Sequence, residues 1–166
     1  MKHDLKLLLV AIVVIAIGYV GYNYIKTPYS TKGYQSLPEF SLKDLEGNKF
    51  TKNNIANNKL KFIMYYNSEC EHCQHQAEQI EQHINTFKDI QLIFISYQDV
   101  SQIKEFAKKY HLELPNATFL EDPKMKVLSQ FNVKGFPFMV IYSKDNQLLK
   151  KFEGPTKIDE ILKYLQ

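Results

Sequence analysis

The chain has 166 residues, a net charge of +3 and 45% apolar residues, a size that predicts one domain with a short appendage. All 21 basic residues are lysines, and no basic stripe with interleaved aromatic residues occurs, so we expect no nucleic-acid partner. Without arginine, the chain cannot form bidentate guanidinium clamps on carboxylate or phosphate groups. Two cysteines are too few for a disulfide scaffold.

The N-terminal part predicts a membrane anchor. Residues 7–25 form a run of nineteen residues without charge, which as a helix is roughly 28 Å long and close to the thickness of a bilayer core. Tyr19, Tyr22 and Tyr24 lie toward one end of the run, where an interfacial aromatic belt is expected. No small-residue cleavage site follows, so we expect a retained anchor rather than a cleaved signal peptide.

Lysines flank this run on both sides, so the positive-inside rule does not orient it. N-terminal anchors of this kind usually export the domain behind them. We therefore expect a short cytoplasmic N-terminus at residues 1–6, a single span of the cytoplasmic membrane at 7–25, a tether at 26–36 and a domain at 37–166. That domain would face the periplasm or the cell exterior.

The C-terminal part alternates strand-like and helix-like segments. Residues 38–51 alternate apolar and polar residues around a turn at Glu46-Gly47-Asn48 and predict a β-hairpin. Polar residues 53–58 follow as a turn or a short helix. The apolar patterns predict strands at residues 60–66, 89–96, 138–142 and 148–152, the last two antiparallel, and helices at residues 71–87, 101–110, 123–131 and 156–165.

The order of these segments indicates the fold class. Ser101 is expected to cap the helix at 101–110, and residues 114–120 are expected to form a loop or a short edge strand. The strand at 89–96 is almost continuously apolar, as in a sheet covered on both faces. Strands that alternate with helices, then a hairpin and a closing helix, predict an α/β sandwich around a central sheet.

Both cysteines, Cys70 and Cys73, lie in one C-x-x-C motif between a predicted strand and a predicted helix. The unpaired N–H groups and the positive dipole end at the start of a helix favour a thiolate on Cys70. A thiolate attacks a disulfide, and Cys73 is spaced to resolve the mixed disulfide. A purely structural disulfide would add little stability, because so short a loop hardly restrains the unfolded chain. The motif therefore predicts thiol–disulfide exchange without a cofactor.

A metal site is the chemical rival of this interpretation. Cys70, His72, Cys73 and His75 are four potential zinc ligands within six residues, but zinc sites usually take their second ligand pair from farther along the chain. We expect no metal ligand among the site residues, and a non-catalytic copper or zinc carrier is the alternative function.

From residue 37 onward the chain resembles the thioredoxin superfamily. Three features carry the resemblance: the Cys70-Glu71-His72-Cys73 motif, the segment Val133-Lys134-Gly135-Phe136-Pro137-Phe138, and residues 38–48. The second is similar to the family's cis-proline segment that faces the cysteines. The third is similar to the N-terminal hairpin of the TlpA/ResA-like and peroxiredoxin-like branches. The resemblance implies a thioredoxin-like three-layer α/β sandwich with an N-terminal β-hairpin extension, preceded by one transmembrane helix.

The resemblance also implies roles for single residues. Cys70 and Cys73 would be catalytic. The bond before Pro137 would be cis, and the backbone of Phe136 would meet an incoming peptide by β-augmentation.

The chain departs from the family around the cysteines. Glu69 stands where the family usually has tryptophan, and Met64 stands near the place of the buried acid of thioredoxins, so no base is assigned to Cys73. His72 and Glu71 are supporting residues: the histidine is expected to lower the pKa of the attacking thiol and the glutamate to raise it.

The resemblance favours a TlpA/ResA-type reductase over an oxidase. Its substrates would be disulfide-containing or dithiol proteins outside the cytoplasm, and a membrane electron donor or acceptor would recycle it. A peroxidase is disfavoured, because peroxiredoxins need an arginine, which this sequence lacks, and a threonine three residues before the nucleophilic cysteine, where Asn67 stands.

Overall fold

The computed structural model describes residues 6, 12–19 and 35–165. The chain divides into two compact units, Met1–Lys32 and Gly33–Gln166.

The predicted span at 7–25 falls in the first unit and lies mostly outside the described residues. Residues 12–19 of that span are helical. Within the described ranges, no helix is long and apolar enough to cross a membrane. The tether is described only at residues 35 and 36, where Ser36 forms an isolated antiparallel bridge to Gln147.

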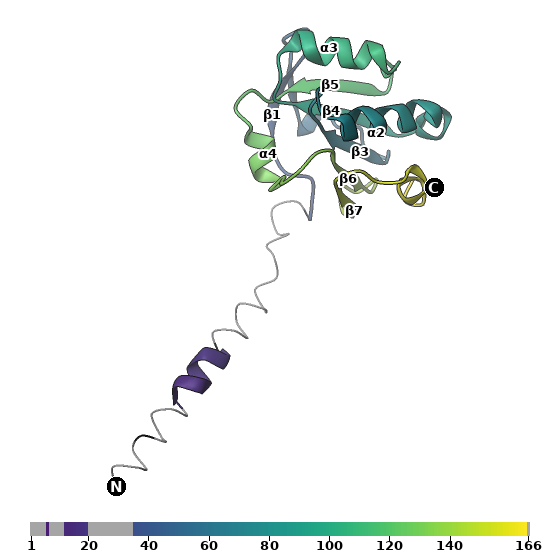
Figure 1. The fold of residues 1–166 in the computed structure, drawn as a ribbon. Coiled ribbons are helices and arrows are strands. Elements are labelled where there is room, and N and C mark those ends of the chain that lie inside the picture. The colour runs from purple at the N-terminus through teal and green to yellow at the C-terminus, as the bar shows by residue number, and fades with distance from the viewer. Residues whose placement is uncertain (1–5, 7–11, 20–34, 166) are drawn as a thin grey trace. The chain divides into compact units, whose positions relative to one another are not determined.

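The second unit is built on one seven-stranded sheet with the order β2-β1-β5-β4-β3-β6-β7 (Figure 1). Strands β3, β4 and β5 run parallel, and the hairpins β1–β2 and β6–β7 extend the sheet antiparallel at its two sides. The strands are Ser41–Asp44 (β1), Lys49–Thr51 (β2), Lys61–Tyr65 (β3), Gln91–Ser96 (β4), Ala117–Glu121 (β5), Phe138–Tyr142 (β6) and Leu148–Glu153 (β7).

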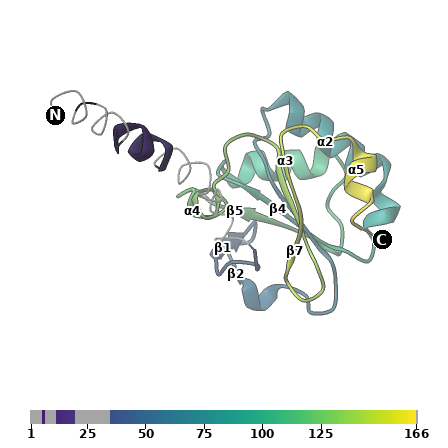
Figure 2. The same ribbon diagram turned by 90° about the horizontal axis from the view of Figure 1, so that it is seen from below.

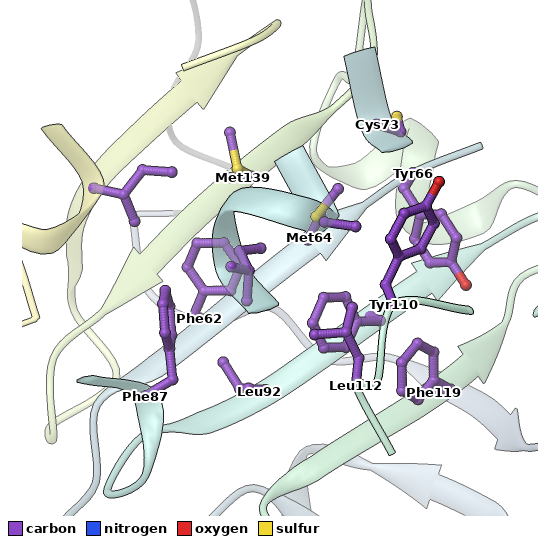
Figure 3. Close-up of a cluster of buried hydrophobic side chains, with 14 of the residues drawn as sticks. Phe62, Met64, Tyr66, Cys73, Phe87, Leu92, Tyr110, Leu112, Phe119 and Met139 are labelled. Atoms are coloured by element: carbon purple, nitrogen blue, oxygen red, sulfur yellow. The ribbon is translucent and has the colours of Figure 1, made fainter. Parts of the chain in front are cut away.

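Helices cover both faces of the sheet, which gives the three layers expected of a thioredoxin-like fold. They are Glu71–Gln82 (α2), Val100–Lys109 (α3), Lys126–Gln130 (α4) and Ile158–Leu162 (α5), with 3₁₀ turns at Lys52–Asn54 and Ile84–Phe87. Helices α2, α3 and α5 lie together on one side (Figure 2). Their apolar residues pack with alternate residues of β3, β4 and β6 into one buried cluster (Figure 3). On the other face, α4 and the β1–β2 hairpin contribute to a second cluster.

The central strands explain why the core forms here. Every residue of β3 and β6 is buried, as predicted for apolar runs in a sheet covered on both faces. The one charged member is Lys61, whose ammonium group donates hydrogen bonds to the carbonyl oxygens of Ser143 at 3.2 Å and Lys144 at 2.9 Å. These bonds replace water around a side chain that would otherwise be costly to bury.

Several details differ from the sequence prediction. The strand β5 is internal rather than at an edge, because the antiparallel hairpin pairs with it through β1. The first long helix ends at Gln82, where the ring of His83 contacts the carbonyl oxygen of Gln79 at 2.9 Å, and a 3₁₀ turn follows. Helix α3 begins at Val100 with Asp99 at the N-cap position, so Ser101 lies in the first turn and is not the cap.

Candidate active site

The two cysteines differ sharply in exposure. Cys70 is the N-cap residue of α2, directly after the loop that leaves β3, and its side chain is partly exposed. Cys73 lies in the first turn of α2 and is fully buried. Both thiols are free. The prediction of a strand-to-helix junction is confirmed, and only the first thiol can meet a large substrate.

The loop before Cys70 is shaped by Asn67. Its side-chain oxygen accepts the N–H of Glu69 at 2.8 Å, and its carbonyl oxygen accepts the N–H of Cys70 at 3.1 Å. The Asn67 amide also donates to the hydroxyl of Tyr97 at 2.8 Å. Because asparagine can fold its own backbone into a turn, this residue directs Cys70 onto the start of the helix.

A second support comes from Gln98, which is largely buried. Its side-chain oxygen accepts a hydrogen bond from the backbone N–H of Ser68 at 2.6 Å, and its side-chain NH₂ group donates to the Ser68 hydroxyl at 2.9 Å. The hydroxyl of Ser96 also donates to Gln98 at 3.2 Å. Together these bonds fix the cysteine loop to the end of β4.

The sequence analysis missed Asn67, Tyr97 and Gln98 as supporting residues. A signal was present, because parallel strands place their carboxyl ends at one edge of a sheet. The residues that follow β4 therefore lie beside those that follow β3.

Burial dominates the electrostatics of Cys73. Burial is the largest cause of a raised pKa, the hydrogen bond from the Asn67 backbone lowers it and Cys70 raises it, and together they bring the pKa of this thiol to about 12. Cys73 is therefore a neutral thiol at physiological pH, and it must lose its proton before it can act as a nucleophile.

No buried acid stands next to the motif at the place that thioredoxins use, because Met64 occupies it and is fully buried in the core. Tyr66 lies in the same cluster as Cys73 (Figure 3). Burial, and secondarily Cys73, raise the pKa of the Tyr66 phenol. Its hydroxyl has no hydrogen-bond partner within the part of the chain that the structure describes. A phenol that keeps its proton is not a base.

The peptide bond between Phe136 and Pro137 is cis, as the resemblance implied. The β3–β6 register pairs Tyr65 with Phe138, so Pro137 lies at the level where β3 ends and the cysteine loop begins. The Phe136 ring lies 6.0 Å from the rings of both Tyr65 and Tyr97, measured between centroids. These two aromatic residues hold the segment before the proline at the cysteine end of the sheet.

The charged residues of the motif point to solvent. Glu71 and His72 are exposed on the first turn of α2, and neither side chain makes a hydrogen bond or an ion pair with a described residue. Their predicted influence on the Cys70 thiol stays a prediction. Glu69 accepts a hydrogen bond from Gln102 at 3.2 Å, and the ring of His75 lies 3.6 Å from the carboxylate of Glu78.

The possible metal ligands do not converge. Within residues 6, 12–19 and 35–165, no group of three or more histidine, cysteine, aspartate and glutamate side chains is placed to hold a metal ion. Cys73 is buried while His72 and His75 are exposed, so the four ligands that are close in sequence do not share one environment.

The sequence matches a known protein family. The model of the AhpC/TSA family matches residues 34–152, more than half of the chain. The chain belongs to the AhpC/TSA family. Membership in this thioredoxin-like redox family supports an oxidoreductase.

The AhpC/TSA chain is similar in sequence to two chloroplastic peroxiredoxin Q proteins. The protein from Populus jackii is 28% identical over 145 residues, which cover 80% of this chain and 67% of that protein. The protein from Gentiana triflora is 29% identical over 142 residues, which cover 78% and 64%. The chain thus spans about two thirds of the length of these relatives.

Solved structures share the fold at low identity. A secreted Mycobacterium tuberculosis disulfide oxidoreductase homologous to E. coli DsbE has a TM-score of 0.66 and 21% identity, with 82% of this chain and 98% of that chain covered. Peroxidoxin BcpB from the same organism has a TM-score of 0.67 and 17% identity, with 78% and 93% covered. An exposed lipoprotein thioredoxin from Streptococcus pneumoniae has a TM-score of 0.61 and 21% identity, with 76% and 97% covered.

Proposed function

We propose that this protein is a thiol–disulfide oxidoreductase that acts on protein cysteines. The observation that carries the proposal is the asymmetry of the pair: a partly exposed Cys70 at the N-cap of α2 and a buried Cys73 one turn later. An accessible thiol forms the mixed disulfide with a large substrate. A shielded thiol that stays protonated resolves it without being captured itself.

The reaction consists of two exchanges. The Cys70 thiolate attacks one sulfur of the substrate disulfide, a new S–S bond forms, and the other substrate sulfur leaves as a thiolate that takes a proton. Cys73 then loses its proton and attacks the Cys70 sulfur, and the second substrate sulfur leaves. Two electrons pass to the substrate, and the protein ends with a Cys70–Cys73 disulfide. The reverse sequence oxidises a dithiol.

The cysteine variants test this assignment. Cys70→Ser is expected to abolish disulfide exchange. Cys73→Ser is expected to retain the first attack and to accumulate a mixed disulfide with a protein substrate, visible on non-reducing gels and by mass spectrometry. Unchanged turnover in either variant would refute the proposal.

We further propose that the protein works as a TlpA/ResA-type reductase. The reduction potential of the cysteine pair, measured by equilibration with glutathione or dithiothreitol, decides the direction. A value near or below that of thioredoxin, about −270 mV, supports a reductase. A value near that of DsbA, about −120 mV, identifies an oxidant in which His72 dominates.

A peroxidase is the second candidate, because the curated relatives are named peroxiredoxins. In that reaction the Cys70 thiolate would cleave the peroxide O–O bond to give an alcohol and a sulfenic acid, which Cys73 would convert to the disulfide with release of water. Asn67 in place of threonine and the lack of arginine argue against it. Peroxide consumption faster than disulfide exchange, under the same reductant, would reverse the order of the two candidates.

We also propose that residues 7–25 anchor the protein in the cytoplasmic membrane with the redox domain outside the cytoplasm. The uncharged run supports the anchor, and two fold neighbours are described as secreted or exposed proteins. Alkaline carbonate should leave the full chain in the membrane pellet, and external protease should digest the domain in cells whose outer layers are opened. Release by carbonate or full protection would contradict the proposal.

A further inference from the structure

A cleft of about 490 Å³ lies between the β1–β2 hairpin and the segment that leads from β5 into α4. Four lysines line it, Lys43 and Lys49 from the hairpin and Lys124 and Lys126 from the other wall. We refer to it as the lysine cleft. Neither cysteine lines it, so the redox reaction does not explain it.

The hairpin places like charges face to face. Lys43 and Lys49 are directly opposite in the antiparallel pair, and the adjacent pair Leu42 and Phe50 is buried, so both lysines lie on the outer face. Like charges in this arrangement repel each other and destabilise a hairpin. The hairpin therefore places a pair of ammonium groups on one wall of the cleft.

The cleft is lined by four lysines but only two carboxylates. Among the described residues, no ion pair is seen for any of the four lysines. Asp122 also lines the cleft, but its carboxylate is buried and accepts hydrogen bonds from Tyr65 and from the backbone N–H groups of Lys126, Val127 and Leu128. Glu121, opposite Lys43 on β5, is the other carboxylate of the lining.

We propose that the lysine cleft binds an anion that carries at least two phosphoryl groups. A phosphoryl group carries up to two negative charges and so matches a pair of ammonium groups better than a carboxylate does. Lysine binds phosphate as a point charge and needs no fixed fork geometry. The lysines stand in pairs on two walls, so one phosphoryl group would meet each pair. The volume lies within the usual range of ligand pockets, roughly 300–1,000 Å³.

Calorimetric titration of the full chain with inorganic tripolyphosphate tests the proposal. The double variant K43Q/K49Q should weaken binding about tenfold or more, since it removes two charged donors. The double variant K104Q/K108Q, which removes the same charge from exposed positions of α3, should bind like the original chain. Without ligand and at low salt, K49Q should raise the thermal midpoint by about 1–4 °C, because it relieves the repulsion.

Two results would overturn the proposal: no binding of tripolyphosphate, or binding that K43Q/K49Q and K104Q/K108Q weaken equally. Equal affinity for citrate would also overturn it, since the phosphoryl preference would be lost. Vesicles with and without anionic phospholipid separate the sources of the ligand. Binding to anionic vesicles that K43Q/K49Q reduces supports a lipid headgroup, and tripolyphosphate binding without that reduction supports a soluble phosphate compound.

Discussion

At the scale of single residues, the site depends on how deeply each thiol is buried. Cys70 at the N-cap and Cys73 in the first turn of α2 are three positions apart, and only Cys73 is fully buried. The N-terminus of α2 offers N–H groups to a thiolate on Cys70, whereas the core around Cys73 disfavours charge. In the proposed reaction, the two thiols of this short motif thus have different tasks.

The pH dependence of resolution follows from this burial. Because burial raises the pKa of Cys73 to about 12, its thiolate fraction, and with it the rate of mixed-disulfide resolution, should rise about tenfold per pH unit below that value. Stopped-flow release of a chromophoric thiol from the mixed disulfide measures the rate, with Cys73→Ser as the control that shows no release. A rate that levels off near neutral pH would instead reveal a base in the site.

The same burial predicts an alkaline loss of stability in the reduced protein. The thiol titrates at its ordinary value of 9.0 when unfolded and at about 12 when folded. Between these values the unfolded state has lost the proton that the folded state keeps, so the free energy of unfolding falls as pH rises from 9.0 toward 12. The slope should be at most about 1.4 kcal/mol per pH unit.

Denaturant titrations at several alkaline pH values measure this slope. Lysines and tyrosines titrate in the same range, so the matched control is Cys73→Ala, which removes the thiol alone. Equal slopes for the reduced protein and for this variant would contradict the prediction.

Gln98 should matter for both stability and activity. Gln98→Ala leaves the N–H and hydroxyl of Ser68 without their partner, which should cost about 1–2 kcal/mol of unfolding free energy. The loosened cysteine loop should lower kcat/KM for disulfide exchange by about 3–10-fold. Gln147→Ala, at an exposed position of the β6–β7 turn, is the control for thermal and kinetic assays. A stable Gln98→Ala variant with full activity would show that the loop needs no such support.

At the scale of the elements, α4 is too short to be stable alone and depends on a side chain outside it. Met125 precedes the helix in a left-handed conformation and offers no side-chain cap. The buried Asp122 caps the helix instead, through the N–H groups of Lys126, Val127 and Leu128. It also accepts a hydrogen bond from the hydroxyl of Tyr65 at 3.1 Å, which connects α4 to β3.

Asp122→Ala should therefore destabilise the fold by about 2–3 kcal/mol, since buried donors lose their acceptor. Chemical denaturation measures the loss. Tyr65→Phe removes one of these hydrogen bonds and keeps the ring beside Phe136, so its loss should be smaller, about 1 kcal/mol. A Tyr65→Phe variant as unstable as Asp122→Ala would assign the stabilisation to the tyrosine.

At the scale of the whole molecule, the redox state should change stability. A reductase has a disulfide form that is more stable than its dithiol form, whereas in an oxidant the reduced form is stabilised. For the reductase proposed here, oxidation should stabilise the fold and raise the thermal midpoint, although the gain is limited because the C-x-x-C loop is short. Thermal-unfolding scans of the oxidised and the reduced full chain measure this difference in stability. Cys73→Ser, which cannot form the bond, should not respond to reductant, and a more stable reduced chain would identify an oxidant.

The sequence by itself determined the elements of the redox domain and the place of the cysteines. Period-two and helical patterns are local, and the short, β-favouring apolar run from Lys61 to Tyr65 favours a buried strand. A C-x-x-C between that strand and a helix already places Cys70 at the start of the helix. The resemblance added the cis bond before Pro137.

Only the tertiary structure decided which residues support the site and how deeply each lies. Asn67 is far in sequence from the adjacent residues Tyr97 and Gln98, and they meet because β3 and β4 are parallel neighbours that end at one edge. The burial of Cys73 depends on the residues that α2, α3 and the sheet bring around it. The internal position of β5 depends on pairing with a hairpin about seventy residues earlier. Local patterns carry no information on such contacts, because they arise only when distant segments pack.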